Sequence, residues 1–162
     1  AVFDDETAAA TAAKWLRKWA QTVPKAKDIR SGAMAILTAD EDREISIRRI
    51  GGHAVGADAG TGLVIGALAG ALAGPAGLLG GLTAGAVIGG IGGRLLHKGL
   101  GMHEGDLADL YDRLCSGRAA LALVVPESRA EATTEQLIDL GGSTRVYTCS
   151  LEELEANRSA RS

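Results

Sequence analysis

The chain has 162 residues, of which 46% are hydrophobic, and its 17 basic and 20 acidic side chains give a formal charge of −3. This length is enough for one domain with a core, with or without a large insertion. The acidic balance argues against a dedicated nucleic-acid binder, whose affinity comes mainly from neutralising phosphates. An aromatic content of 3% argues against a base-stacking platform. Two cysteines, Cys115 and Cys149, cannot form a disulfide framework and favour a reducing compartment.

The first predicted elements are a strand and a helix. Residues 1–3 read as the tail of an apolar strand that has been cut short, which points to residues upstream of Ala1. Acidic and capping residues at 4–7 then begin a helix that runs to about Thr22. Its apolar residues recur at spacings of three and four, which predicts one buried face: Ala8, Ala12, Trp15, Leu16, Trp19 and Val23.

A β-hairpin is predicted next. The apolar run 33–37 is followed by a polar turn at 39–42, and residues 43–50 then alternate between apolar and polar side chains. After a long uncharged region, 104–115 has helical periodicity, and the dense apolar run 118–125 predicts a central strand.

The C-terminal part of the chain predicts a helix, a strand and a further short helix. A capping box at Ser128–Glu131 begins a helix that ends before Gly141, residues 144–148 read as a last strand, and Ser150 begins a second capping box. The order is therefore β-α-β-β, insertion, α-β-α-β. It predicts a small α+β domain over 1–55 and 101–162, with its helices on one face of a sheet, and an inserted helical hairpin over 56–100.

The insertion contains two glycine ladders. No charged residue occurs from Ala59 to Gly93, and Pro75 divides this run into two arms. Within each arm glycine recurs every four residues, which places the glycines on one face of a helix. The ladders are Gly62, Gly66, Gly70 and Gly74 in the first arm, and Gly77, Gly81, Gly85, Gly89 and Gly93 in the second.

Such a ladder predicts close helix–helix contact. Glycine within a helix costs about 1 kcal/mol relative to alanine, so the arms need close packing to offset this loss. Each arm is shorter than the roughly 20 residues that cross a bilayer, so a membrane and a protein core remain alternative surroundings. Basic residues at the exit of the second arm, Arg94, His97 and Lys98, are suited to contact lipid headgroups.

The whole chain resembles a family of small bacterial glycine-zipper proteins of uncharacterised function. The features that carry this resemblance are the opening Val2–Glu6, the charged hairpin, the glycine-rich hairpin and the capped α-β-α-β end. The most specific of them are Val2–Glu6 and Gly70–Gly85. The resemblance implies a ferredoxin-like α+β sandwich that carries the hairpin and is associated with a membrane. It supplies no catalytic residues.

No constellation typical of an enzyme is visible, and we predict no catalytic residue, metal or cofactor. A weaker alternative places a metal at the end of the hairpin, where histidines and carboxylates gather: His53, His97, His103, Glu104 and Asp106. We therefore expect a non-enzymatic structural protein that forms homo-oligomers through the hairpin, at the cytoplasmic side of the bacterial inner membrane or in a cytoplasmic assembly. The alternatives are a soluble cage, ring or filament with the hairpins buried inside, and an accessory or ligand-binding subunit of a larger membrane complex.

Overall fold

The computed structural model describes residues 1–22, 34–50, 59–73, 99–150, 152–153 and 156. Four strands and four helices are defined within these residues. In chain order they are β1 (Val2–Phe3), α1 (Glu6–Thr22), β2 (Met34–Ala39), β3 (Ile45–Ile50), α3 (Ala59–Ala73), α5 (Glu104–Cys115), β4 (Ala119–Leu123) and α6 (Glu127–Asp139). The predicted α+β class is confirmed. Outside residues 74–98, which the structure does not describe, the predicted helices and strands up to residue 125 lie close to their expected positions.

The strands form one antiparallel sheet in the order β1-β4-β2-β3. The predicted hairpin is present, since β2 pairs with β3 from Met34↔Ile50 to Ala39↔Ile45. The short strand β1 pairs with the beginning of β4 through Val2↔Ala120 and Phe3↔Ala119. β4 therefore lies between β1 and β2, as expected for a central strand.

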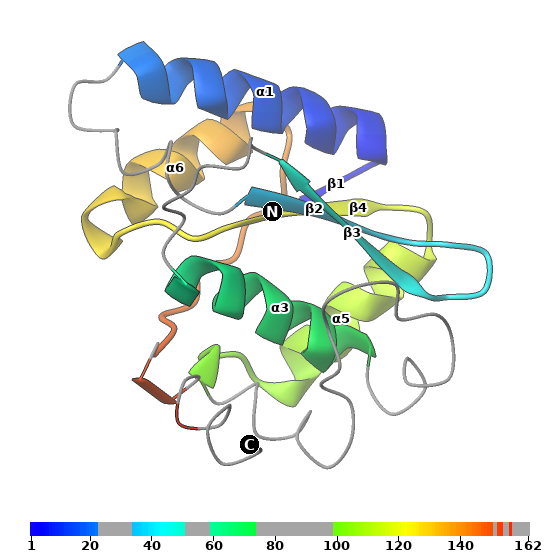
Figure 1. Cartoon of the computed structure of the whole chain (residues 1–162). Helices are drawn as coiled ribbons and strands as arrows, with labels where there is room; N and C mark the ends of the chain where they lie inside the picture. The colour runs from blue at the N-terminus through cyan, green and yellow to red at the C-terminus, as the bar shows by residue number, and fades with distance from the viewer. Residues whose placement is uncertain (23–33, 51–58, 74–98, 151, 154–155, 157–162) are drawn as a thin grey trace.

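The helices cover both faces of this sheet, so the prediction of helices on one face is wrong. Helices α1 and α6 lie over one face, and α3 and α5 lie over the other (Figure 1). The reason is that the central strands are apolar on both sides. In β2, Met34 and Ile36 face α1 while Leu37 faces α5, and all three are buried. Continuous apolar strands of this kind are typical of sheets with both faces covered.

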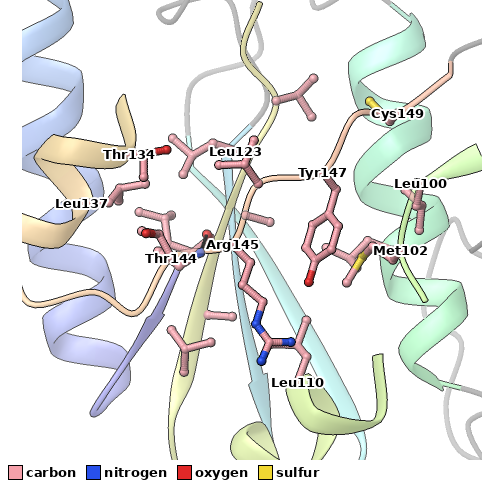
Figure 2. A pocket seen from close by; sticks show the side chains of 18 of the residues that line it. Leu100, Met102, Leu110, Leu123, Thr134, Leu137, Thr144, Arg145, Tyr147 and Cys149 are labelled. Carbon is pink, nitrogen blue, oxygen red and sulfur yellow. Dashed lines mark hydrogen bonds between the residues drawn. The ribbon is translucent and has the colours of Figure 1, made fainter. Parts of the chain in front are cut away.

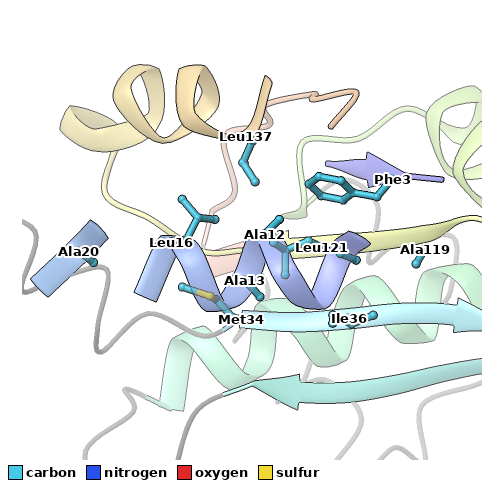
Figure 3. Packing of buried hydrophobic residues seen from close by; sticks show 11 residues of the cluster. Phe3, Ala12, Ala13, Leu16, Ala20, Met34, Ile36, Ala119, Leu121 and Leu137 are labelled. Atoms are coloured by element: carbon cyan, nitrogen blue, oxygen red, sulfur yellow. The ribbon is translucent and has the colours of Figure 1, made fainter. Parts of the chain in front are cut away.

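Helix α1 packs its small side chains against the sheet (Figure 3). An Asp5 carboxylate oxygen accepts a hydrogen bond from the Ala8 N–H at 2.7 Å, which caps the first turn. The buried face differs from the predicted one, because Trp15 is 39% exposed and stacks on Trp19 at the edge of the helix. The residues that fill the interface are Ala9, Ala12, Ala13, Leu16 and Ala20. Alanine on this face lets α1 lie close to the strands.

The C-terminal part contains two further corrections. Helix α6 begins at Glu127 after Pro126, without a side-chain cap, because proline already holds the extended backbone that precedes a helix; the Ser128 capping box is therefore not used. Residues 144–148 do not form a strand; only Ser143 pairs, through an isolated bridge to Val2. The predicted end of the helix is confirmed by Gly141, which has a φ of +85°.

The first predicted arm of the hairpin is helical, as α3. It packs within the domain, where Leu72 joins Leu37, Leu114 and Ala120 in a core cluster on the second face of the sheet. Gly74, the last glycine of the first arm, lies outside the described residues. So does the second arm with Gly77, Gly81, Gly85, Gly89 and Gly93, and so do Arg94, His97 and Lys98.

Candidate functional site

Helix α3 has an apolar arc and a glycine face. The apolar residues of α3 are already packed within the fold: Leu72 is buried in a cluster with Leu37 of the sheet, and Ala67 is buried in a cluster with Leu100 and Met102. Ile65 is also buried. Three of the predicted glycines, Gly62, Gly66 and Gly70, belong to this helix. At successive rotations of 100° per residue they fall on the arc between the buried side chains.

The glycine face is open at Gly66. Among the described residues, no heavy atom lies within 4 Å of the position that a Cβ on Gly66 would take. Gly66 and Gly70 are each only partly exposed, because buried alanines flank them at 67 and 69. The result is a partly exposed strip without side chains at Gly66 and Gly70, next to residues of α3 that are packed within the fold.

A second feature is a cavity of about 460 Å³ that the sequence did not predict (Figure 2). It lies between β4, α6 and the extended segment 143–149, and it reaches α5 and the start of the chain. Its lining is mostly aliphatic and aromatic, with Leu123, Leu137 and Tyr147 as examples. The hydroxyl Oγ1 of Thr133 on α6 also lines it, and this buried oxygen has no hydrogen-bond partner among the described residues.

Charges gather at one end of the cavity. The guanidinium of Arg145 contacts a carboxylate oxygen of Asp106 at 2.7 Å and one of Asp109 at 3.1 Å. A hydrogen bond with Tyr147 and then these two carboxylates raise the pKa of Arg145. Because these side chains are substantially exposed, the ion pairs contribute little to stability. Their effect is to hold the segment 143–149 next to α5.

Ala1 places a buried amino group next to the cavity. The amino group of Ala1 donates a hydrogen bond to the Leu121 carbonyl at 3.0 Å, and burial lowers the pKa of this amino group from 8.0 to about 6. The Ala1 residue also lines the cavity. This lowered pKa favours the neutral form of the amino group at pH 7.

The histidine and cysteine residues that the structure describes take part in helix capping and packing. His103 is the N-cap residue that precedes α5, and its backbone N–H donates to an Asp106 carboxylate oxygen at 3.3 Å. Cys115 and Cys149 are free thiols in partly buried positions, and a hydrogen bond with Cys115 raises the pKa of Tyr111. The described part of the chain contains no group of three or more histidine, cysteine or acidic side chains that could hold a metal. His53 and His97 lie outside it.

Comparison with known proteins gives no match: no protein family, no curated protein and no solved structure is similar to this chain at a significant level.

Within the described residues, no helix combines the length and the apolar character that crossing a membrane requires.

Proposed function

We propose that the protein is a structural, non-enzymatic component that self-associates through the glycine face of α3, defined by Gly62, Gly66 and Gly70. The single observation that carries this proposal is the open position at Gly66, on a helix whose apolar arc is already packed against the sheet and α5. The glycine strip remains as the surface available for another helix.

Glycine favours helix–helix contact because two backbones can approach closely where no side chains keep them apart. Glycines four residues apart let two helix backbones lie nearer to each other than side chains would allow, which adds dispersion and weak Cα–H···O contacts. The glycines weaken α3 on its own by about 1 kcal/mol each relative to alanine. Contact with a second helix offsets this cost, and the residues beyond α3 in sequence repeat the same four-residue spacing.

The partner that we propose is the same hairpin in another copy of the chain, with the two arms of residues 56–100 forming one zipper unit. This extends the resemblance to the bacterial glycine-zipper family, which remains a proposal, as does a location at the inner membrane or in a cytoplasmic assembly. With 15 residues and a length of about 22 Å, α3 lies flat on its own domain. Its packing therefore favours assembly between copies over direct contact between α3 and lipid.

The test replaces glycine with leucine on this face. Gly66→Leu adds a side chain where the isolated fold has room, so circular dichroism should be unchanged while the native mass falls from an oligomer to a monomer. Gly105→Leu on α5 is the matched control, since the Cβ position of Gly105 is equally open, and its mass should equal that of the unmodified chain.

Native mass is measured by sedimentation with and without detergent. A high-mass species that survives in Gly66→Leu contradicts the proposal. A monomer in detergent and an aggregate without it, in the unmodified chain, would instead indicate the accessory subunit of a membrane complex.

A further inference from the structure

The cavity beside β4 connects two apolar clusters of the core. At one end, Leu137 of α6 belongs to the cluster that packs against α1, and at the other end Leu100 belongs to the cluster that Tyr147 joins. Figure 2 shows Leu137 and Leu100 on opposite sides of the cavity, with Tyr147 between them. Its volume of about 460 Å³ lies within the range of small-molecule sites. At about 30 Å³ for a group the size of a water molecule, it has room for roughly fifteen non-hydrogen atoms.

Helix α6 presents an unpaired hydroxyl group to this cavity. Four of its residues, spaced three and four apart and therefore on one face, line the cavity: Ala130, Thr133, Thr134 and Leu137. The Thr134 hydroxyl donates to the Ala130 carbonyl at 2.7 Å, which is the usual arrangement for threonine in a helix. Thr133 is only 3% exposed, and its Oγ1 has no hydrogen-bond partner among the described residues. Because buried hydroxyl groups are normally paired, this atom indicates a partner that enters from the cavity.

The ionised side chains of the lining largely neutralise one another. Arg145 contacts Asp106 and Asp109, and Arg113 contacts Asp109 at 3.0 Å. Two guanidinium groups therefore meet two carboxylates and leave no surplus charge for an ionised ligand. Glu127, the remaining charged side chain of the described lining, is exposed at the start of α6 and repels an anion. An ionised ligand would lose its hydration without gaining an unpaired partner, so the lining favours an uncharged one.

We propose that the cavity is a binding site for an uncharged amphipathic small molecule, with an alkyl or aromatic body and one hydroxyl group that pairs with Thr133 Oγ1. The apolar body lies between the clusters of Leu137 and Leu100. A ligand hydroxyl group suits Thr133 because each of the two hydroxyls can donate or accept. The site does not depend on self-association, since Gly66 and Gly70 are not among the residues that line the cavity.

The experiment measures the binding of three probes to the full chain by isothermal titration calorimetry. The probe 4-phenyl-1-butanol carries the proposed hydroxyl group, pentylbenzene has a methyl group in its place, and 4-phenylbutanoate carries a negative charge. We expect the alcohol to bind at least about tenfold more tightly than the carboxylate, because the charge would lose its hydration in the cavity.

The decisive variant is Thr133→Val, which keeps the shape of the side chain and removes the hydroxyl group. It should weaken the binding of 4-phenyl-1-butanol about fivefold and should not weaken that of pentylbenzene. The matched control is Thr134→Val, whose hydroxyl is already paired within α6, so its affinity for the alcohol should stay within about twofold of the unmodified chain. Urea titration should find Thr133→Val at least as stable as the unmodified chain, since it removes an unpaired buried hydroxyl.

A second pair of variants places the probes in the cavity. Ala130→Leu extends a side chain into the cavity and should abolish the binding of 4-phenyl-1-butanol and pentylbenzene. Ala132→Leu, on the same helix but not among the lining residues, should leave both affinities unchanged.

Three results would overturn the proposal. Equal effects of Thr133→Val and Thr134→Val on the alcohol would remove Thr133 as the partner of the hydroxyl group. Tighter binding of 4-phenylbutanoate than of the alcohol would assign the cavity to an anion. Binding that survives Ala130→Leu, or no binding of any probe, would show that the cavity is not a ligand site.

Discussion

Helices α1 and α3 cover opposite faces of the same sheet, yet their outer surfaces differ. The outer side of α1 carries exposed charged residues, including Lys14, Arg17 and Lys18, which water solvates. Helix α3 has no charged residue, and its glycine face is partly exposed at Gly66 and Gly70. A charged outer surface is well solvated and keeps a monomer soluble in water. An uncharged strip of bare backbone, in contrast, contributes to stability only when another surface packs against it. Their inner surfaces, in contrast, perform the same task of covering the sheet.

The largest expected effect on stability comes from truncating one buried leucine on the inner surface of each helix. Leu16 on α1 is fully buried and Leu72 on α3 is 5% exposed, so Leu16→Ala and Leu72→Ala should each lower the free energy of unfolding by about 2–5 kcal/mol in urea titrations. The reason is the lost apolar contact together with the cavity that each truncation leaves. A value near zero for Leu72→Ala, with a normal value for Leu16→Ala, would mean that α3 does not pack on the sheet in solution.

A second prediction concerns how stability depends on pH. The amino group of Ala1 packs beside the α1 cluster, and its pKa is about 6 when folded against 8.0 as the ordinary value. Between these values the unfolded chain binds more protons than the folded chain, so stability rises with pH. A chain that begins at Ala1 should gain about 2–3 kcal/mol between pH 5.5 and 8.5, in two-state unfolding experiments.

Acetylation of the Ala1 amino group is the control for this pH dependence. The acetylated chain keeps the backbone but has no titratable amine, so its stability should lack the rise that the free amine produces. The difference between the two pH profiles removes the contributions of histidines and acidic groups. Parallel profiles would show that the amino group is solvated, which contradicts the buried position of Ala1.

The sequence predicted the elements whose pattern has a clear period. The spacing of apolar residues alone predicts α1, the hairpin of β2 and β3, and α5. Helix α3 is apolar on nearly every side, so its sequence does not indicate which side packs against the sheet. A signal for the two-sided sheet was nevertheless present, since Met34–Leu37 has no polar residue that could face water. The cavity could not be predicted, because it is formed by segments from distant parts of the sequence and depends on their register.

The smallest expected effects come from replacing glycine by alanine at an open position and at a tightly packed position. At Gly66 a Cβ meets open space among the described residues, so Gly66→Ala should raise the unfolding free energy of the monomer by about 0.5–1 kcal/mol through helix propensity. At Gly142 a Cβ would lie 2.8 Å from the Phe3 ring and 2.9 Å from the Leu137 carbonyl oxygen. Gly142→Ala should therefore lower stability, by about 1–3 kcal/mol.

The sign of the effect at Gly66 should depend on protein concentration. In dilute solution the added methyl group stabilises α3, whereas at concentrations where copies associate the same methyl group holds two helix backbones apart and weakens the complex. Thermal unfolding over a hundredfold range of concentration measures both effects in one variant. A stabilisation that is equal at every concentration would show that the glycine face contacts no partner, and the contrast between α1 and α3 would then reflect composition rather than assembly.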